Sequence, residues 1–558
     1  MLAKTHSSDE TTKLASNFTE LSFADCQTSA ENGNSYGIFM LGYCYEHGID
    51  VEKDENKAFS YYLKSAKMNN PRGTFQVGFC FYHGIGTKMD KRKAFKYYQK
   101  SAELNNSNGI FKTAVCYYYG IGVEKNVKKF WEWISKSPSH GKCAHCNKNN
   151  TSKAWCLICD PDITVRGWSS RNEKIDDCIK EFQFRTFEYV NVIEWIPFNR
   201  LSNIETIGKG GFATVYSATW LDGIRKIDEI EIDNHYSYKK SRESNSIVAL
   251  KTLASSEENN FDFLKEFKSF MECKLNCSKL AIYGITQNTE TNEYLMVYQY
   301  ANNGNLYKYL RDNFNKLTWM TKLQILKDIS EELFYIHNRA GYTHADFHSG
   351  NILQDQRNNE NMRSYIADLG LSRKNDAYVP EGYIYGVMPY VAPEVLSGNV
   401  KFTQAADIYG FGVIMTEVST GQRPFDGYKF DINLAVMICN GLRPGFASGT
   451  PDCYIEFANQ CMDSDPQKRP NISKINNVIC EWLRNLASDN ETEIKKQFLN
   501  ADKAIKTLQI IPQHHPDHMY TSKIISTQRI SNAVKEETYA TSKSIKFIEI
   551  PSGKCMLK

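Results

Sequence analysis

A repeated pattern in the first part of the chain places the strongest constraint on its fold. Apolar and aromatic stretches end at three glycines that lie 36 residues apart, Gly48, Gly84 and Gly120. A second amphipathic stretch follows each glycine, at residues 57–62, 93–98 and 129–134. Self-similarity at one such period is typical of solenoids, in which each repeat buries its apolar face against its neighbours. The pattern therefore predicts a stack of similar units.

Within each copy the pattern predicts a helix, a loop and a second helix. The first helix carries a small residue where two helices would approach closely; these residues are Gly42, Gly78 and Ala114. The glycine after that helix favours a left-handed cap, a conformation in which glycine is the least strained residue. Aromatic side chains of the second helix recur on one face and fit the core of the solenoid itself. A protein partner would bind the concave face, whose residues the pattern does not identify.

The copies resemble Sel-like repeats, which are relatives of the tetratricopeptide repeat, over about residues 35–140. The third copy departs from the pattern at Phe130 and Pro138, as a terminal, capping repeat does. The resemblance implies an α-helical repeat domain at residues 16–140 that binds another protein. We expect residues 1–15 to be disordered because they are polar and terminal.

Two Cys-x-x-Cys pairs follow the repeats, Cys143 with Cys146 and Cys156 with Cys159. A two-residue spacer lets both thiolates of a pair face one ion, and two pairs complete a closed tetrahedral site of four sulfurs. The spacing predicts structural Zn²⁺ in a small unit at residues 141–165, which is too short to have a core of its own. A redox dithiol is the alternative for one pair, but two pairs in tandem favour zinc.

Residues 166–199 connect the zinc unit to the rest of the chain. Apolar side chains from Cys178 to Trp195 fit one face of a helix, and Pro197 would end that helix. We expect an amphipathic helix here that braces the zinc unit against the following domain.

A glycine-rich run after residue 200 is a candidate nucleotide-binding loop between two strands. Its residues are Ile207, Gly208, Lys209, Gly210, Gly211, Phe212, Ala213, Thr214 and Val215. Glycine allows a backbone to close over phosphate groups. Residues 221–247 are polar and charged, and they are predicted to form a loop insertion. Lys251 then ends an apolar stretch, where a lysine is unfavourable unless its charge is used.

Two polar motifs further along the chain complete the pattern, His344–Asn351 and Asp368-Leu369-Gly370. In this order the motifs resemble those of protein kinases over about residues 200–485. The resemblance implies a bilobal α+β domain that binds Mg·ATP and passes the γ-phosphate to a protein hydroxyl. It assigns five roles: Asp346 accepts the hydroxyl proton, Asn351 and Asp368 hold Mg²⁺, Lys251 holds phosphates, and Glu266 pairs with Lys251. Glu257 and Glu258 fit the last role less well because they precede the predicted helix.

The same resemblance assigns residues around the nucleotide and in the support of the site. Tyr298 falls at the gatekeeper position, and the backbones of Gln299 and Ala301 are expected to meet adenine. Glu394 and Arg469 are expected to form an ion pair that supports the larger lobe.

Three positions depart from the commonest kinase pattern. Ala345 replaces the arginine that pairs with a phosphorylated activation loop, and alanine cannot make that interaction. His348 and Val387 replace the lysine and threonine that interact in most Ser/Thr kinases. Their surroundings are more similar to the tyrosine-kinase-like group, whose members mostly phosphorylate Ser/Thr. Serine and threonine acceptors are therefore expected, with tyrosine as the alternative.

A pseudokinase scaffold is the competing interpretation. Pseudokinases typically lack the phosphate-binding lysine or one of the two aspartates, whereas this chain has Lys251, Asp346 and Asp368. Catalysis is therefore favoured. A nucleic-acid-binding zinc protein is disfavoured, because 67 basic and 64 acidic residues leave a net charge of only +3.

Composition sets the compartment that we expect. No apolar run approaches the roughly 18–20 residues that span a bilayer, so no membrane insertion is expected. The 16 cysteines indicate a reducing compartment, the cytoplasm or the nucleus. Residues 486–558 are polar and are predicted to be a flexible tail. The chain as a whole is predicted to be multidomain, with an α-helical repeat solenoid, a small zinc-knuckle linker and a bilobal α+β kinase domain.

Overall fold

The computed structural model describes residues 23–546 of the 558-residue chain. The description leaves out residues 50, 53, 135, 137–141, 148–149, 157–158, 187, 210–212, 233–234, 253–261, 276–278, 357–361, 375–381, 399–400 and 506–513. Predictions for residues 1–15, Gly210, Gly211 and Phe212 therefore lie outside it. The chain divides into a first unit (Met1–Asn203, Ala218–Ile247 and Ile282–Thr286) and a second unit (Ile204–Ser217, Val248–Ala281 and Gln287–Lys558).

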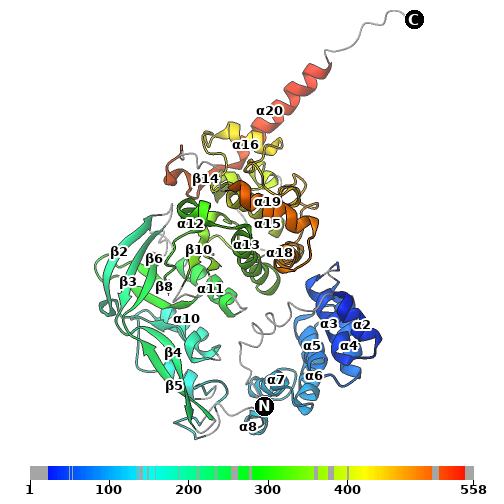
Figure 1. The fold of residues 1–558 in the computed structure, drawn as a ribbon. Coiled ribbons are helices and arrows are strands. Elements are labelled where there is room, and N and C mark those ends of the chain that lie inside the picture. Colours follow the sequence, from blue (N-terminus) through cyan, green and yellow to red (C-terminus); the bar gives the residue numbers. More distant parts are fainter. Residues whose placement is uncertain are drawn as a thin grey trace, which may run out of the picture. The chain divides into compact units, whose positions relative to one another are not determined.

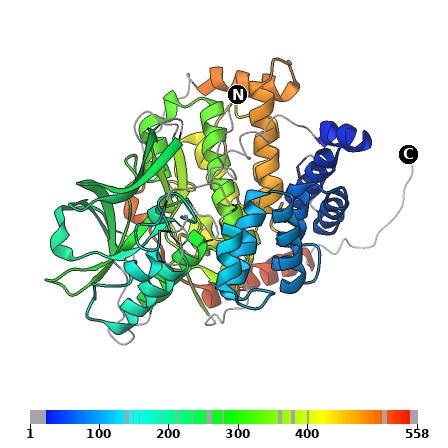
Figure 2. The same ribbon diagram turned by 90° about the horizontal axis from the view of Figure 1, so that it is seen from below.

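Helices α2–α8 of the first unit form the repeat array. They are α2 (Phe23–Glu31), α3 (Ser35–His47), α4 (Glu55–Lys67), α5 (Pro71–His83), α6 (Lys91–Glu103), α7 (Ser107–Tyr119) and α8 (Val127–Ile134). Each helix packs against its neighbours in sequence, and the helices form one continuous stack in both views (Figures 1 and 2). The predicted helix–loop–helix repeats are confirmed.

The repeated residues at the helix ends explain where these helices start and stop. Asn34, Asn70 and Asn106 precede α3, α5 and α7, and each side-chain oxygen accepts a hydrogen bond from an amide of the first turn. The same helices end at glycines in the left-handed conformation, namely Gly48 (φ 66°), Gly84 (φ 76°) and Gly120 (φ 74°). The predicted glycine caps are therefore confirmed.

The close approach of helices within a repeat is also confirmed. A Cβ atom at Gly42 would lie 2.7 Å from Cδ1 of Tyr62, and one at Gly78 would lie 2.8 Å from Cδ1 of Tyr98. Both tyrosines are buried, and they belong to one apolar cluster that runs through the repeats. The repeated aromatic residues thus build the core of the array.

The first unit continues beyond the repeats in short elements. They are α9 (Asp160–Thr164), α10 (Glu173–Phe184), η2 (Tyr189–Asn191), β1 (Glu194–Trp195), η3 (Phe198–Arg200), β4 (Ile224–Ile232), β5 (His235–Glu243) and β7 (Ile282–Gln287), the last residue of which belongs to the second unit.

The helix predicted for residues 178–195 is wrong in its extent, because α10 ends at Phe184 and residues 194–195 form β1. β1 pairs in parallel with β7, with Glu194 opposite Gly284. A Cβ atom at Gly284 would lie 1.8 Å from the carbonyl oxygen of Glu194, so glycine permits this pairing. The partner strand β7 is distant in sequence, and the helical spacing of apolar residues in 178–195 does not predict pairing with it.

The prediction of a loop at residues 221–247 is also wrong. Strands β4 and β5 pair antiparallel from Ile224 opposite Glu243 to Ile232 opposite His235. Ile227 packs against the cluster formed by Trp155, Tyr189 and Val192. The hairpin was missed because its strands are rich in charged residues and its apolar contact comes from the zinc-knuckle segment and the linker after it.

A six-stranded sheet has the strand order β1-β7-β8-β6-β3-β2. Its further strands are β2 (Leu201–Lys209), β3 (Thr214–Trp220), β6 (Ser246–Thr252) and β8 (Tyr294–Gln299). β6 and β8 are antiparallel, and Lys251 lies opposite Met296. All residues of β6 except Ile247 are buried, which places the lysine in an apolar strand at the base of the site.

The second unit is mainly helical beyond this sheet. Its helices are α11 (Asp262–Leu275), α12 (Leu306–Asn313), η4 (Phe314–Lys316), α13 (Trp319–Phe334), the π-helix η5 (Tyr335–Arg339), η6 (Ser349–Asn351), η7 (Met388–Tyr390), α14 (Pro393–Leu396), α15 (Gln404–Thr420), α16 (Ile432–Cys439), α17 (Asp452–Cys461), α18 (Ile472–Ala487), α19 (Glu493–Ile505), η8 (Asp517–Tyr520) and α20 (Thr527–Lys546). Nearly every side chain of α15 is buried, so this helix forms the centre of the helical core. No helix in the described residues combines the length and the apolar character that crossing a membrane requires.

Three two-stranded sheets complete this unit. They pair β10 (Ile352–Asp355) with β11 (Arg363–Ile366), β12 (Arg373–Lys374) with β9 (Tyr342–Thr343), and β13 (Tyr383–Gly386) with β14 (Lys523–Ser526). The first two hold the loops that carry the polar motifs, and the third joins the predicted tail to the segment before Pro393.

The flexible tail predicted for residues 486–558 is therefore wrong for the described part of that segment. On α19, Phe498 is fully buried and packs against Trp319 and Trp482. Asp502 accepts a hydrogen bond from the amide of Trp319 at 2.7 Å. The polar composition of residues 486–558 predicted a flexible tail because it does not reveal that a few apolar residues, such as Phe498, pack against residues far away in sequence.

Candidate active site

Lys251 on β6 makes two ion pairs. Its Nζ lies 2.6 Å from Oε1 of Glu266 on α11 and 2.7 Å from Oδ1 of Asp368. Lys251 is 8% exposed. Burial opposes its charge, but the two carboxylates outweigh burial and raise the pKa of Lys251 above its usual value. The ammonium group therefore stays charged and could bind a phosphate group.

The partner of Lys251 is the glutamate that the resemblance assigned. Leu264, Phe267 and Phe270 bury one face of α11, and this packing fixes the helix that carries Glu266. The alternative partners Glu257 and Glu258 lie outside the described residues.

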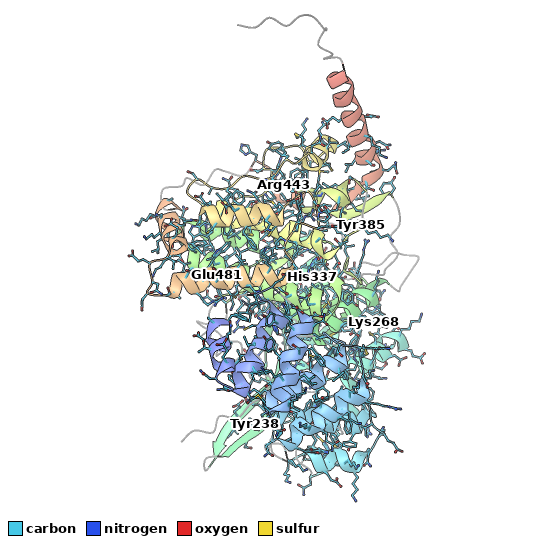
Figure 3. All side chains as sticks on the ribbon, turned by 90° about the vertical axis from the view of Figure 1, so that its right-hand side faces the viewer. Tyr238, Lys268, His337, Tyr385, Arg443 and Glu481 are labelled. Atoms are coloured by element: carbon cyan, nitrogen blue, oxygen red, sulfur yellow. The ribbon has the colours of Figure 1, made fainter. Side chains whose placement is uncertain are left out.

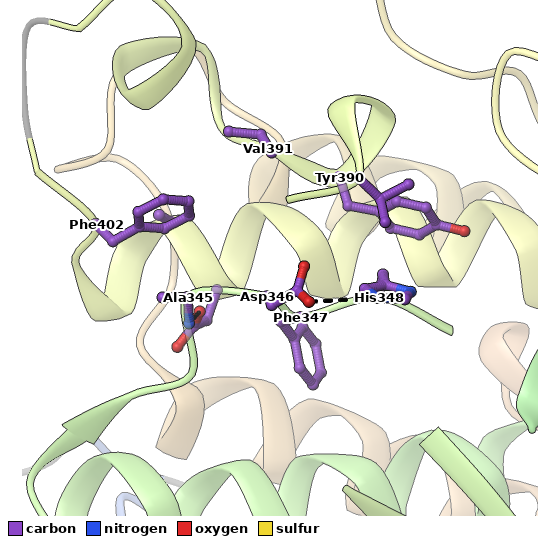
Figure 4. A pocket seen from close by; sticks show the side chains of 10 residues that line it. Ala345, Asp346, Phe347, His348, Tyr390, Val391 and Phe402 are labelled. Atoms are coloured by element: carbon purple, nitrogen blue, oxygen red, sulfur yellow. Dashed lines mark hydrogen bonds and ion pairs between the residues drawn. The ribbon is translucent and has the colours of Figure 1, made fainter. Parts of the chain in front are cut away.

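Asp346 follows β9 in a buried loop and is 8% exposed. Its Oδ2 lies 3.7 Å from Nε2 of His348 (Figure 4). Burial would raise the pKa of Asp346, but His348 and the hydrogen bonds to its carboxylate lower the pKa below the usual value. Oδ1 has no hydrogen-bond partner among the described residues. An ionised carboxylate with one unused oxygen is suited to accept a proton from a hydroxyl group.

His348 is oriented by the turn that follows it. The amide of Gly350 donates to Nδ1 of His348 at 3.1 Å. A neutral ring that accepts at Nδ1 carries its proton on Nε2, the atom that faces Asp346. The histidine that replaces the usual lysine can therefore donate toward the same carboxylate.

Asp407 on α15 holds the backbone of this loop. Its carboxylate accepts hydrogen bonds from the amides of His344 at 2.7 Å and Ala345 at 3.0 Å, and Nε2 of His337 lies 2.8 Å away. Ala345 has φ 65°, a left-handed conformation that is unfavourable for a residue with a Cβ atom. The two hydrogen bonds from the backbone amides to Asp407 stabilise that conformation next to Asp346. Ala345 and Phe402 line the same small pocket (Figure 4).

Asn351 and Asp368 offer the oxygens that a divalent cation would need. The amide nitrogen of Asn351 donates to the carbonyl oxygen of Asp346 at 3.0 Å, which leaves its amide oxygen as the possible ligand. Asp368 has φ 61°, so the chain turns sharply where its carboxylate meets Lys251. Two oxygen donors of this kind fit Mg²⁺, which prefers carboxylate and carbonyl ligands and keeps several waters.

The candidate nucleotide contacts lie on adjoining strands. Ile207, Gly208 and Lys209 end β2, Ala213 precedes β3, and Thr214 and Val215 begin β3. A Cβ atom at Gly208 would meet nothing within 4 Å, so open space lies beside this part of the backbone.

The candidate hinge lies at the end of β8. Tyr298 is buried, and the amide of Gln299 donates to the carbonyl oxygen of Ala281 at 2.9 Å. Ala301 follows the strand. Because β8 pairs with β6, the hinge and Lys251 belong to neighbouring strands, as a ligand with a base at one end and phosphates at the other requires.

The predicted ion pair between Glu394 and Arg469 is confirmed. Nη1 and Nη2 of Arg469 donate to the two carboxylate oxygens of Glu394 at 2.8 and 2.7 Å. Both residues are buried. The arginine also donates to the carbonyl oxygens of Asp463 and Ala405 at 2.8 Å, so its charge is fully used.

The four clustered cysteines lie close together in the first unit. The sulfur atoms of Cys143, Cys146, Cys156 and Cys159 lie within 4.8 Å of one another, and those of Cys146 and Cys156 are 3.9 Å apart. Four sulfurs bound at about 2.3 Å to one tetrahedral zinc ion are about 3.8 Å apart. The cluster therefore fits zinc. Asp160 accepts from the amide of Cys156 at 2.6 Å and thus holds one ligand in place.

Comparison with known proteins decides the family. The family model for protein tyrosine and serine/threonine kinases matches residues 201–479, half of the 558-residue chain. The chain belongs to the protein kinase family. The Sel1 repeat model matches the same kinase at residues 35–70, 71–106 and 107–137, which coincide with the paired helices of the array.

Curated relatives of the kinase come from a slime mould and a plant. It is 28% identical to the probable serine/threonine-protein kinase roco5 of Dictyostelium discoideum over 49% of this chain and 9% of that protein. It is 28% identical to the probable LRR receptor-like serine/threonine-protein kinase MEE39 of Arabidopsis thaliana over 60% of this chain and 36% of that protein. It is 30% identical to the calcium/calmodulin-regulated receptor-like kinase 1 of Arabidopsis thaliana over 44% of this chain and 58% of that protein. The chain thus spans less than two thirds of these relatives.

One residue at the site was missed by the sequence analysis. Oγ of Ser522, which precedes β14, donates a hydrogen bond to Oδ2 of Asp346 at 2.5 Å. The only available sign was the short apolar island Ile524-Ile525 in a polar segment. Two apolar residues in a polar segment do not predict where a strand will pair.

Proposed function

We propose that this kinase transfers the γ-phosphate of Mg·ATP to serine and threonine hydroxyls of proteins. The observation that carries the proposal is the ion-paired group of Lys251, Glu266 and Asp368 in the same unit as the buried, ionised Asp346. We propose the five catalytic roles stated for Asp346, Lys251, Asn351, Asp368 and Glu266. A pseudokinase scaffold has no comparable observation in its favour.

Each of these residues has a definite task in the proposed reaction. Glu266 positions Lys251, whose ammonium group would bind phosphate oxygens. Asp346 would accept the proton of the acceptor hydroxyl through Oδ1 or Oδ2, and His348 would orient that carboxylate. Asn351 and Asp368 would hold Mg²⁺, which when bound supplies positive charge against the phosphates. Residues 207–215 would cover the phosphates, and the backbones of Gln299 and Ala301 would bind adenine.

The proposed preference for serine and threonine rests on two supports. The relatives named above include probable serine/threonine-protein kinases. His348 and the buried Val387 replace the usual lysine and threonine together, as in the tyrosine-kinase-like group. The pair therefore indicates a coordinated variant of a Ser/Thr site.

A transfer assay tests this preference. Purified full-length protein is incubated with Mg·[γ-³²P]ATP and three peptides that differ only in Ser, Thr or Tyr at the acceptor position. We expect acid-stable label in the serine and threonine peptides and background label in the tyrosine peptide. A tyrosine peptide labelled faster than the other two would contradict the proposed acceptor class.

We also propose the domain division 16–140, 141–165, 166–199 and 200–485 for the repeats, zinc knuckle, linker and kinase domain. The Sel1 repeats would bind a protein partner, and their aromatic core leaves that task to other side chains. We propose a reducing compartment, the cytoplasm or the nucleus, because thiolates persist as metal ligands there. No role for nucleic acid is proposed.

The four cysteines are proposed to bind one structural zinc ion. The segment that they close contacts the β4–β5 hairpin: Lys240 of β5 lies 2.5 Å from Asp160, and Lys153 pairs with Glu229 of β4. A closed four-sulfur site would add folding free energy without a catalytic role.

Metal analysis tests the zinc proposal. We expect one zinc ion per chain by elemental mass spectrometry, and Cys156→Ala should release it because three thiolates no longer close the site. Cys453→Ala is the control, since Cys453 is a half-buried thiol that lies outside the cluster, on α17. A wild-type protein prepared with zinc in the medium but containing none, or a Cys156→Ala variant with full zinc content, would refute the site.

A further inference from the structure

The segment before β14 places a hydroxyl group on the proposed catalytic carboxylate. Oγ of Ser522 lies 2.5 Å from Oδ2 of Asp346 and donates to it. Asp346 is 8% exposed, so the hydroxyl reaches a buried group rather than a surface acid. A hydroxyl that donates to a general base is in the position of the nucleophile in phosphoryl transfer.

Backbone pairing holds this segment in an extended conformation. β14 pairs antiparallel with β13, with Lys523 opposite Gly386 and Ser526 opposite Tyr383. The amide of Thr527 donates to the carbonyl oxygen of Gly382 at 3.1 Å and extends the pairing by one residue. Tyr385 of β13 lies near the first turns of α20 (Figure 3). Addition of a strand to an exposed edge is a common way to bind an extended peptide.

An aromatic anchor lies two residues before Ser522. The ring of Tyr520 is 3% exposed, packs edge-on against Phe430 at 5.0 Å between centroids, and lies under the guanidinium of Arg423 at 4.6 Å. Its hydroxyl donates to the carbonyl oxygen of Pro424 at 3.1 Å. Buried tyrosines with a satisfied hydroxyl are typical anchors of recognised peptides.

A second contact lies upstream of this anchor. The amides of His514 and His515 donate to the two carboxylate oxygens of Asp426 at 2.7 and 2.9 Å. Residues 514–527 are therefore held at the histidines, at Tyr520, at Ser522 and along β14. A segment with this many specific contacts occupies the site as a bound substrate would.

We propose that Ser522 is an intramolecular phosphoryl acceptor, and that residues 514–527 are a built-in substrate of the kinase domain. This inference rests on the proposed function. Oγ of Ser522 would form a bond to the γ-phosphorus of a nucleoside triphosphate as the bond from that phosphorus to the β-phosphate oxygen breaks. The hydroxyl proton passes to Asp346, and the nucleoside diphosphate keeps the electron pair of the broken bond. The phosphate adds negative charge beside Asp346 and should release the segment.

The contacts also indicate which external peptides the site would take. An acceptor serine with an aromatic residue two positions earlier and an apolar residue three positions later would reproduce Tyr520 and Ile525. Ile525 is 6% exposed, whereas Ile524 is 61% exposed, so the third position after the serine contributes the apolar contact.

Phosphosite mapping tests the proposal. Full-length protein is dephosphorylated, freed of phosphatase, incubated with Mg·ATP and analysed by peptide mass spectrometry. We expect phosphate at Ser522 with a first-order rate constant that does not change with protein concentration, because the acceptor is part of the same chain. Thr521→Ala is the matched control: this neighbouring hydroxyl donates to the carbonyl oxygen of His518 instead, and its removal should leave the rate unchanged.

Tyr520→Ala should slow phosphorylation of Ser522 about tenfold, which corresponds to roughly 1.4 kcal/mol of lost docking free energy. Docking itself is measured without nucleotide by hydrogen exchange of the amides of Lys523, Ile525 and Thr527, the alternate residues that face β13. These amides should be protected in the wild-type protein and exchange at least about tenfold faster in Tyr520→Ala.

The outcomes separate this inference from the proposed function. Transfer to an external serine peptide without phosphate at Ser522 would overturn the inference and leave the proposed function standing. Phosphate at Thr521 instead, a rate constant proportional to protein concentration, or unprotected β14 amides in the wild-type protein would overturn it as well. Protected amides with no transfer to any acceptor would overturn both, because the segment would then be a bound inhibitor of an inactive domain.

Discussion

Asp346→Asn should lower the rate of phosphoryl transfer to a serine peptide by about 10²- to 10⁴-fold, the usual contribution of a general base. The amide keeps the shape of the side chain and a hydrogen bond to Ser522 or to a substrate hydroxyl, but it cannot accept the proton. Nucleotide affinity, measured by calorimetry with a non-hydrolysable ATP analogue, should change little because Lys251 and its ion pairs remain.

Asp312→Asn is the control for this substitution, since Asp312 is exposed and pairs with its neighbour Arg311 on the surface. Its rate should equal that of the wild-type protein. A folded Asp346→Asn protein that transfers phosphate at the wild-type rate would show that another group accepts the proton.

Arg469→Met should lower the free energy of unfolding of the kinase domain by about 3–5 kcal/mol, the typical loss when one partner of a buried ion pair is removed. The substitution leaves the Glu394 carboxylate buried without its bidentate partner and removes the donors to the carbonyl oxygens of Asp463 and Ala405. Urea unfolding followed by fluorescence measures the change, and Trp482 provides a buried reporter in the same unit.

Arg311→Met is the matched control, because the Arg311–Asp312 pair is exposed and such pairs contribute about 0–1 kcal/mol. The double variant Glu394→Leu with Arg469→Met should be more stable than Arg469→Met alone, since no buried charge is left unpaired. A loss below about 1 kcal/mol for Arg469→Met would show that the pair is not the support of the lobe that its geometry indicates.

The repeats and the chemical groups of the site were predictable because the signals are local. A glycine after each first helix must take a left-handed conformation, and the structure has φ 66° at Gly48 and φ 76° at Gly84. Lys251 in an apolar strand needed a buried acid, and Glu266 with Asp368 supplies the charge. Such requirements follow from one residue and its neighbours in sequence.

The parts that were missed depend on contacts between distant segments. The β4–β5 hairpin consists largely of charged residues, and it is anchored by Ile227 in a cluster with Trp155 and Tyr189. β1 forms because Gly284 allows a strand to approach. The placement of Ser522 requires pairing between β14 and β13, which no local pattern in the polar tail indicates.

The departures from the common kinase pattern at Ala345 and His348 can be related to the proposed acceptor Ser522. Ala345 cannot bind a phosphorylated activation segment, and in this structure β13 of that segment is instead paired with β14. His348 takes a place beside Asp346 that leaves room for the hydroxyl of Ser522 on the same carboxylate oxygen. The proposed catalytic carboxylate thus contacts the proposed acceptor from the same chain.

The central claim is that this chain transfers a γ-phosphate through Asp346. The most direct measurement compares label transfer from [γ-³²P]ATP and from [α-³²P]ATP, each with Mg²⁺ and a serine peptide, for the wild-type protein and Asp346→Asn. The account predicts acid-stable label in serine from the γ-labelled nucleotide alone, and its near-complete loss in the variant. A folded wild-type protein that binds ATP but leaves both the peptide and itself unlabelled would contradict the account and indicate a scaffold.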